Sequence, residues 1–393
     1  MPTTSGITAF DRPLGGHATE GLNTRGRILE NPVAAADRFK PQGRVIDIQE
    51  YGSGNVNDSF LVTLHSQGEK HFILQRINTR VFCQPELITG NMRTLTEHVR
   101  RRLQRAPVSA GRRWEVPRVL LTQEGQGHWV DSSGSFWRAI SFIDAAQSFD
   151  TVRDIEHASE VGYALGAFHG LISDLPSDTL ADTLEGFHIT PRYLRHYGEV
   201  LAQAHPGNSP EVNYCLGFVS ERRIWAHVLE DAKAQGRLRL RPIHGDPKVN
   251  NVMIDTATGR AISIVDLDTV KPGLVHYDIG DCLRSCCNPW GEETERWEAV
   301  RFNPDLCQAI LRGYLPLARD FLTGNDYEYL YDSIRLIAFE LGLRFFTDYL
   351  AGNVYFKVRH REHNLARALV QFKLAESIES QETTIRAIIQ EMR

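Results

Sequence analysis

Short apolar stretches bounded by turn residues fill the first third of the chain. Such stretches, four to eight residues long and rich in Val, Ile and Phe, are typical of β-strands. They predict strands at 45–48, 60–65, 71–77, 119–121, 128–130 and 136–142. Between the third and fourth strands, apolar residues recur at helical spacing over 85–103 and predict one amphipathic helix. The N-terminal part is therefore expected to be a small β-rich lobe.

From residue 158 onward, the apolar positions recur mostly at the spacing of α-helices. They predict helices at 158–171, 192–204, 220–234, 333–350 and 369–392. One short hairpin interrupts them, with strands at 252–254 and 261–265 around a turn at 255–260. We expect an α+β, bilobal, protein-kinase-like fold, with an N-terminal arm (1–40, at most a short capping helix near 31–39), an N-lobe (41–143) and a mostly helical C-lobe (144–393).

Composition excludes several classes of partner. The 393 residues carry a net charge of −5 and no long basic block, which argues against nucleic-acid binding. No apolar run approaches the ~18 residues of a membrane span. The six cysteines are too few and too irregular for a disulfide framework, and Cys282 and Cys286 are expected to be buried thiols and not a metal pair. We expect a cytoplasmic monomer or homodimer without a membrane partner.

The loop before the hairpin carries the chemistry. His244, Asp246 and Asn251 reproduce the kinase spacing H-x-D-x-x-x-x-N, with Gly245 in place of Arg, and Asp266 ends the second hairpin strand. In that pattern the first Asp accepts the proton of the acceptor hydroxyl, while the Asn and the second Asp hold magnesium. Asp and Asn also crowd ordinary turns. The attached strand pair and its terminal Asp nevertheless favour a phosphotransferase centre that uses ATP and Mg²⁺.

Upstream residues fit a nucleotide site. A glycine-bearing turn between the first two strands would let backbone N–H groups approach phosphate oxygens, and extended backbone after the last strand would meet the adenine edge. These candidates are Gly52, Ser53, Gly54, Asn55, Phe142 and Ile143. Where a kinase has a Lys on its third strand, this chain has Gln75 and Arg76, which alternate in direction, so only one can face the nucleotide. The sequence does not decide which.

Other polar residues have more than one interpretation. Glu97 on the first helix is a candidate partner of Arg76, although a solvated surface Glu is favoured. His169 is interpreted as a packed residue and not as a base. Asp278 is expected to cap a helix, and Glu340 and Arg344 to pair on a helix surface. The chain has no G-x-x-x-x-G-K-[ST], so a P-loop NTPase is not supported.

Several motifs taken together resemble the aminoglycoside phosphotransferase superfamily. They are YGSGNVNDSFLV, FILQRIN, the TEH of residues 96–98, IHGDPKVNNVMID, VDLDTVKPGL, YDIGD and FELGLRFFTDYLAGNVYFK. Within the superfamily the chain is most similar to the N-acetylhexosamine 1-kinases, over about 51–357. This resemblance implies transfer of the ATP γ-phosphate to the anomeric hydroxyl of GlcNAc or GalNAc. It implies Asp246 as the base, Asn251 and Asp266 as magnesium ligands, and sugar contacts at Asp58, Asp281, Arg344 and Tyr355.

Two alternatives stay open at this point. The same fold could phosphorylate an amino alcohol, an aminoglycoside or another sugar. Cationic acceptors call for an acidic pocket, whereas Arg344 and Tyr355 suit a neutral sugar better. A non-catalytic nucleotide-binding protein would be expected to lack Asp246, Asn251 or Asp266, and all three are present.

Overall fold

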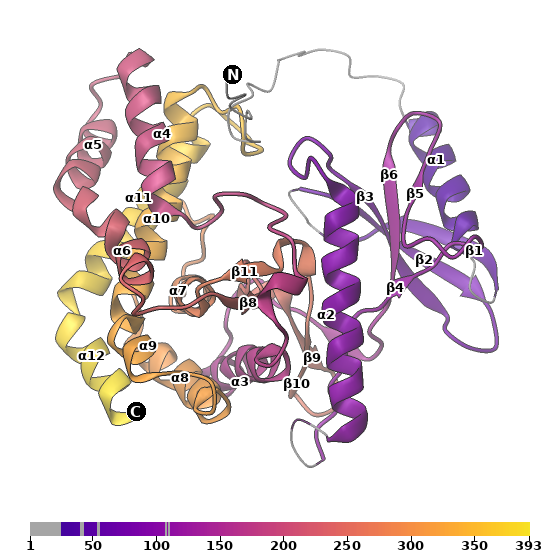
Figure 1. Cartoon of the computed structure of the whole chain (residues 1–393). Coiled ribbons are helices and arrows are strands. Elements are labelled where there is room, and N and C mark those ends of the chain that lie inside the picture. The colour runs from indigo at the N-terminus through magenta and orange to yellow at the C-terminus, as the bar shows by residue number, and fades with distance from the viewer. Residues whose placement is uncertain (1–24, 40–42, 53–55, 107, 109–110) are drawn as a thin grey trace, which may run out of the picture.

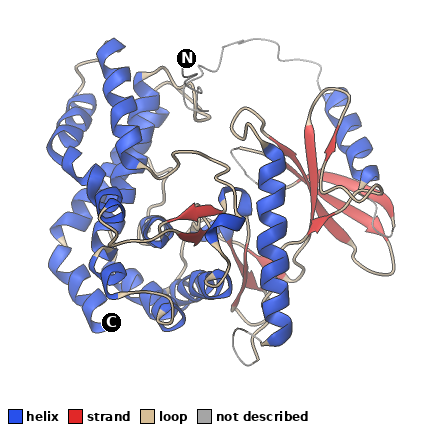
Figure 2. Cartoon of the chain, viewed as in Figure 1, coloured by secondary structure: helices blue, strands red, loops and turns tan. Residues whose placement is uncertain are grey.

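The chain folds into two lobes, one built on a β-sheet and one mostly of helices (Figure 1). The computed structural model describes residues 25–39, 43–52, 56–106, 108 and 111–393. Most strands gather on one side of the molecule and most helices on the other (Figure 2). This arrangement confirms the expected α+β class with a β-rich N-terminal lobe and a mostly helical C-terminal lobe.

The N-lobe is a twisted antiparallel sheet flanked by two helices. Its elements are α1 (Arg25–Arg38), β1 (Arg44–Glu50), β2 (Asp58–His65), β3 (His71–Ile77), α2 (Pro85–Arg105), β4 (Val119–Leu120), β5 (Trp129–Val130) and β6 (Phe136–Ser141). The strand order is β1-β2-β3-β6-β4, with β5 also paired to β6. Alternate residues of β2, β3 and β6 form a core under the end of α1, which includes Phe60, Leu74, Trp137, Ala36 and Phe39. Helix α2 lies between this sheet and the C-lobe (Figure 1).

The C-lobe packs helices around the hairpin and its neighbouring loop. Its α-helices are α3 (Ile155–Ile172), α4 (Thr190–Gln203), α5 (Pro210–Arg222), α6 (Val228–Ala234), α7 (Val275–Cys286), α8 (Pro304–Ala318), α9 (Gly324–Glu328), α10 (Leu330–Leu350), α11 (His363–Ser380) and α12 (Glu382–Glu391). Its strands are β7 (Ala146–Gln147), β8 (Arg241–Ile243), β9 (Val252–Asp255), β10 (Ala261–Ile264) and β11 (Lys271–Gly273). Short 3₁₀ helices occupy Ser177–Thr179, Arg223–His227, Val249–Asn251, Leu267–Thr269 and Trp297–Ala299.

The predicted strands agree with the observed ones to within about two residues, and 71–77 coincides with β3. Three predicted helices were wrong in extent. The short capping helix expected near 31–39 is α1, which begins at Arg25. The helix placed at 220–234 is α5, which begins at Pro210 with Ser209 as its cap, followed by a 3₁₀ turn and α6. The single helix at 369–392 is two helices, α11 and α12. Helix α8 was not predicted.

The cysteines and helices agree with two further expectations. All six cysteines are free, and Cys282 and Cys286 are buried in α7. Within the described part of the chain, every helix is too short or too polar to cross a membrane.

Candidate active site

Asp278 anchors the loop that carries His244, Gly245 and Asp246. Its carboxylate accepts the backbone N–H groups of His244 (2.6 Å) and Gly245 (2.8 Å) and contacts His169 Nε2 (2.8 Å). Burial acts to raise the pKa of Asp278, but the hydrogen bond and charge of His169 and the bonds from the loop hold it below its ordinary value. The predicted helix cap at Asp278 was wrong, because α7 begins at Val275 and this carboxylate points at the loop.

His169 is a packed residue, as expected. It is buried in α3 and also contacts Tyr314 Oη at 3.0 Å. A histidine enclosed in this way positions Asp278 and has no access to a substrate. The loop that carries Asp246 is therefore held by a buried chain of three polar side chains, Tyr314, His169 and Asp278.

Gly245 takes the motif position at which protein kinases have Arg, and the local backbone accepts only glycine there. Its φ is +89°, and a Cβ at this position would lie 2.7 Å from the carbonyl oxygen of Thr269. The loop and the segment after β10 are also joined by side chains. Thr269 Oγ1 donates to His244 O (2.8 Å), and His244 Nε2 donates to Val265 O (2.9 Å). These two hydrogen bonds hold the loop against the segment after β10, which brings Asp246 and Asp266 to one site.

Asn251 and Lys248 both bind the Asp246 residue. Asn251 Nδ2 donates to the Asp246 carbonyl at 2.7 Å, which leaves Asn251 Oδ1 available as an oxygen ligand. Lys248 Nζ lies 2.8 Å from Asp246 Oδ2, and the negative charge of Asp246 raises the pKa of this lysine. No role was predicted for Lys248. Its place two residues after the Asp, in D-P-K, was the available signal.

Asp266 begins the segment opposite the loop in a left-handed conformation, with φ +63° and ψ +58°. Burial raises its pKa to about 7, and the neighbouring charges of Asp268 and Asp246 add to the effect. A divalent cation would relieve this repulsion. Mg²⁺ commonly takes one or two protein carboxylates plus waters and phosphate oxygens. Asn251 Oδ1 and Asp266 offer oxygen ligands of this kind, so the residues fit the expected metal.

Gln75, and not Arg76, faces the C-lobe. Arg76 pairs with Asp58 (2.6 Å) at the surface and lies on the face of β3 that carries the α1-side core. Gln75 Oε1 accepts Arg138 Nε (3.0 Å) and Nη2 (2.7 Å) from β6. Arg138 in turn binds Asp268 of the C-lobe. The structure therefore does not bring Arg76 or Asp58 together with Asp246.

The other predicted nucleotide contacts are two residues after β6, Ile143 and Phe142, and the residues of the glycine-bearing turn. Ile143 packs with Met253 and Ile262 into a small apolar cluster where the lobes meet. Phe142 contacts the rings of Tyr51 and His71, with centroids 6.0 and 5.5 Å away. Gly52 has a φ of +79° and open space around its α-carbon. Residues Ser53, Gly54 and Asn55 lie outside the described residues.

The Glu97 side chain is at the surface, bound to Arg93 (2.7 Å), as the solvated interpretation required.

Helix α10 supports the loop from the side opposite the hairpin. Glu340 is buried and binds His188 Nδ1 (2.9 Å) and Thr190 Oγ1 (2.6 Å). His188 Nε2 contacts the carbonyl of Gly245 at 2.8 Å. Burial opposes both charges, yet each partner stabilises the other, which raises the pKa of His188 and lowers that of Glu340. The expected surface pair of Glu340 with Arg344 was therefore wrong.

Arg344 lies one turn after Glu340, near Asp246. Its guanidinium carbon is 5.1–5.5 Å from the ring centres of Phe187, Tyr193 and Phe356. Burial acts to lower its pKa, but Tyr193, Tyr355, Glu340 and Asp246 raise it overall. Tyr355 is held beside it because Asp348 accepts the N–H groups of residues 354–356 at 2.8–2.9 Å. Arg344 and Tyr355 thus share one side of the site.

Asp281 is the fourth predicted acceptor contact and lies one turn after Asp278 on α7. Its Oδ1 accepts the Arg284 guanidinium (2.8 Å), which also binds Glu292 (2.9 Å). Its Oδ2 is buried without a hydrogen-bond partner. An enclosed carboxylate oxygen of this kind is costly unless a ligand donates to it. Arg284 was not predicted, because its contacts depend on side chains that the sequence alone does not bring together.

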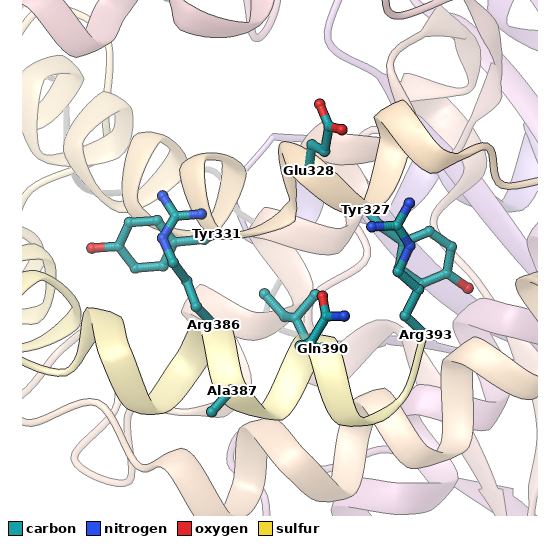
Figure 3. A pocket seen from close by; sticks show the side chains of 8 residues that line it. Tyr327, Glu328, Tyr331, Arg386, Ala387, Gln390 and Arg393 are labelled. Atoms are coloured by element: carbon teal, nitrogen blue, oxygen red, sulfur yellow. The ribbon is translucent and has the colours of Figure 1, made fainter.

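A separate hollow of about 580 Å³ lies between α9, α10 and α12 (Figure 3). It is at the edge of the C-lobe farthest from the sheet (Figure 1). Its arginines already have partners: Arg386 binds Glu382 (2.6 Å) and lies 4.3 Å from the Tyr331 ring centre, and Arg393 lies over Tyr327. None of the loop residues described above lines it.

Comparisons with known proteins agree with this geometry. Residues 47–319 match the sequence profile of the phosphotransferase enzyme family. An aminoglycoside phosphotransferase from Alicyclobacillus acidocaldarius superposes with a TM-score of 0.60 at 14% identity, over 96% of this chain and 99% of that one. A microcompartment-associated aminopropanol kinase gives 0.57 at 16% identity, over 89% and 98%. A spectinomycin phosphotransferase in complex with ADP and spectinomycin gives 0.51 at 13% identity, over 90% and 98%.

Proposed function

Because this chain belongs to the phosphotransferase enzyme family, we propose that it transfers the γ-phosphate of ATP to the anomeric hydroxyl of an N-acetylhexosamine. The product would be GlcNAc or GalNAc 1-phosphate. The spectinomycin phosphotransferase of similar fold binds ADP, which supports an adenine nucleotide here. The sequence motifs that resemble N-acetylhexosamine 1-kinases support the sugar.

The observation that carries the choice of a neutral acceptor is the set of cations around Asp246. The charge of Asp246 contributes to the raised pKa of three cations, Lys248, Arg284 and Arg344. It is the main cause of the raised pKa of Lys248. For Arg284 and Arg344, burial acts in the opposite direction, yet nearby acidic groups that include Asp246 raise the pKa of both. These cations offer N–H donors, which suit the oxygens of a neutral sugar, whereas an ammonium group has no lone pair with which to accept them. This donor set therefore fits a sugar better than the ammonium group of an amino alcohol or aminoglycoside.

In this mechanism Asp246 orients the acceptor hydroxyl and takes its proton. Phosphoryl transfer passes through a loose transition state in which the hydroxyl loses its proton late, so position matters more than base strength. Lys248 holds the carboxylate itself, while Asn251 and Asp278 hold the backbone of the loop that carries it. Mg²⁺ held by Asn251 and Asp266 would supply positive charge against the phosphate oxygens.

The acceptor is held by groups around the same loop. Asp281 Oδ2, buried and without a partner, would accept a sugar hydroxyl. Arg344 and Tyr355 would donate to sugar oxygens, with the aromatic rings around Arg344 limiting its movement. An anomeric hydroxyl is more acidic than other sugar hydroxyls, which suits a carboxylate base. These contacts select a polyhydroxylated, uncharged molecule.

The test is ATP consumption by the purified protein with a panel of free hexosamines, other sugars, amino alcohols and aminoglycosides. We expect turnover with GlcNAc or GalNAc, and a loss in kcat of roughly 10²–10⁴-fold in Asp246→Asn. Turnover with an amino alcohol alone would contradict the proposed acceptor. An Asp246→Asn variant with wild-type kcat would contradict the proposed base.

A further inference from the structure

The third strand of this chain lacks the cation that protein kinases place there. Gln75 is neutral, and Arg76 is on the opposite face, bound to Asp58. In protein kinases that lysine contacts the α- and β-phosphates and is held in place by a glutamate of the neighbouring helix. Here Glu97 of α2 is bound to Arg93 at the surface. Neither member of the usual pair is present at its usual place.

A different cation occupies the face of the sheet that Gln75 shares. Arg138 on β6 is the direct cross-strand partner of Gln75. It is 1% exposed, so its position is set by its contacts. Gln75 Oε1 accepts both Nε (3.0 Å) and Nη2 (2.7 Å), while Ser59 fixes the Gln75 amide by accepting Nε2 at 3.0 Å. An uncharged Gln at position 75 therefore serves to orient an arginine.

The guanidinium is held along one edge only. Its contacts to Gln75 and to Asp268 use Nε and Nη2, whereas Nη1 is buried with no acceptor. A buried guanidinium N–H group without an acceptor is costly, and native structures rarely leave one unpaired without a ligand. Phosphate oxygens are the acceptors that a guanidinium edge binds most strongly.

Arg138 is joined to the segment that carries Asp266. Asp268 is two residues beyond Asp266, one of the two residues that fit magnesium. Asn57, at the end of the glycine-bearing turn, donates to Asp268 Oδ2 at 2.6 Å. Arg138 is also among the charges that lower the pKa of Asp266, against the larger effect of burial. Gln75 and Asp268 thus bind the guanidinium directly, and Asn57 is joined to it through Asp268.

We propose that Arg138 binds the phosphates of the nucleotide through its unpaired Nη1 group, in place of a lysine on the third strand, and that Gln75 and Asp268 hold the guanidinium in position. This inference rests on the proposed use of ATP. The Arg138–Asp268 pair replaces the lysine–glutamate pair of protein kinases, with the cation moved from β3 to β6. The carboxylate of the pair, which protein kinases place on the helix after the third strand, is here Asp268 of the C-lobe.

The experiment compares nucleotide binding by calorimetry with ATP, ADP and adenosine, in the presence of Mg²⁺. Arg138→Met should weaken ATP and ADP roughly 10–100-fold, the value of a charge-assisted contact, and change adenosine less than about twofold. The matched control is Arg118→Met, which removes an exposed arginine bound to Glu69 in the same lobe and should alter none of the three affinities. Equal weakening of adenosine and ATP would show a structural role only and overturn the inference.

Two further variants keep the test decisive if Arg138→Met fails to fold. Removing one member of a buried ion pair leaves an unpaired charge, so Arg138→Met/Asp268→Asn removes both. That double variant should bind adenosine normally and ATP weakly. Adding Gln75→Lys to it, which returns a lysine to β3, should recover at least part of the ATP affinity. Wild-type ATP affinity in the double variant would contradict the proposal.

The failure of this inference is distinguishable from the failure of the proposed function. Wild-type protein that phosphorylates GlcNAc with ATP, together with unchanged ATP binding in Arg138→Met, would overturn the arginine assignment alone. Wild-type protein that binds neither ATP nor ADP would overturn both.

Discussion

At the residue scale, the site depends on a small number of backbone and charge requirements. Gly245 needs a positive φ and has no room for a Cβ. Asp278 and His188 bind the backbone of the two residues that precede Asp246. The positions of Asp246, Asn251 and Asp266 in one site were predictable because their residue types and spacing match the protein-kinase pattern. The roles of Arg138, His188 and Arg284 were not predictable, because their contacts depend on how side chains pack in the folded chain.

The pH dependence of stability tests the carboxylate cluster. The folded pKa of Asp266, about 7, is above its ordinary value, so the folded state binds the proton more tightly than the unfolded state. Without metal, this residue should therefore favour folding at low pH, and its contribution should be lost as pH rises from ~4 through ~7. The free energy of unfolding of Asp266→Asn should exceed that of the wild type by about 2 kcal/mol at pH 8. At pH 4 the two free energies should be nearly equal.

Urea unfolding of both proteins in EDTA at the two pH values measures this difference. Repetition with excess Mg²⁺ and ATP should reverse the order at pH 8, because the wild-type carboxylate then has a cation to bind. Equal pH dependence in the two proteins would show that Asp266 does not titrate in this range.

At the element scale, strands were predicted better than the helices of the C-lobe. Helix α8 was missed, and it contains Gly313 and Pro316, two residue types that are unfavourable in helix interiors. Its stability comes from packing. The backbones of α3 and α8 approach so closely that a Cβ on Gly162 would lie 1.9 Å from Ile310 O, and one on Gly313 would lie 2.1 Å from Ser159 O. Local patterns do not contain this contact.

Glycine-to-alanine variants test this packing. Gly313→Ala should destabilise the protein by about 2–4 kcal/mol, because the added methyl group forces two helices apart. The control is Gly198→Ala, in the exposed interior of α4, where nothing lies within 4 Å of a Cβ. That change should stabilise by about 0.5–1 kcal/mol. Denaturant unfolding measures both, and a neutral Gly313→Ala would contradict the close approach of α3 and α8.

At the scale of the whole molecule, the two lobes are joined by polar contacts between distant segments. Arg138 and Asn57 of the N-lobe both bind Asp268 of the C-lobe. Asn91 on α2 donates to Ala181 O (2.8 Å) and Val270 O (2.9 Å) and accepts the Ala181 N–H (2.9 Å). The two-lobe division was predictable from the change in hydrophobic period. These junctions were not, because they pair residues about 90–210 positions apart.

Asn91→Ala tests the junction. It removes three hydrogen bonds and leaves buried backbone groups without partners, so we expect a loss of about 2–3 kcal/mol in the free energy of unfolding. Asn213→Ala, which removes one exposed contact to Asn208 O, should cost less than about 0.5 kcal/mol. Similar losses in the two variants would show that the lobes are not coupled through Asn91.

In the proposed reaction, Asp246 directs the γ-phosphate of ATP to the anomeric oxygen of a hexosamine. Phosphorus–proton NMR of the product made from ATP and GlcNAc or GalNAc locates the transferred phosphate. We expect a phosphorus resonance coupled to the anomeric proton H1, absent when Asp246→Asn replaces the wild-type protein. A phosphorus coupled to any other ring or side-chain proton would show that the phosphate goes to a different oxygen and overturn the proposed function.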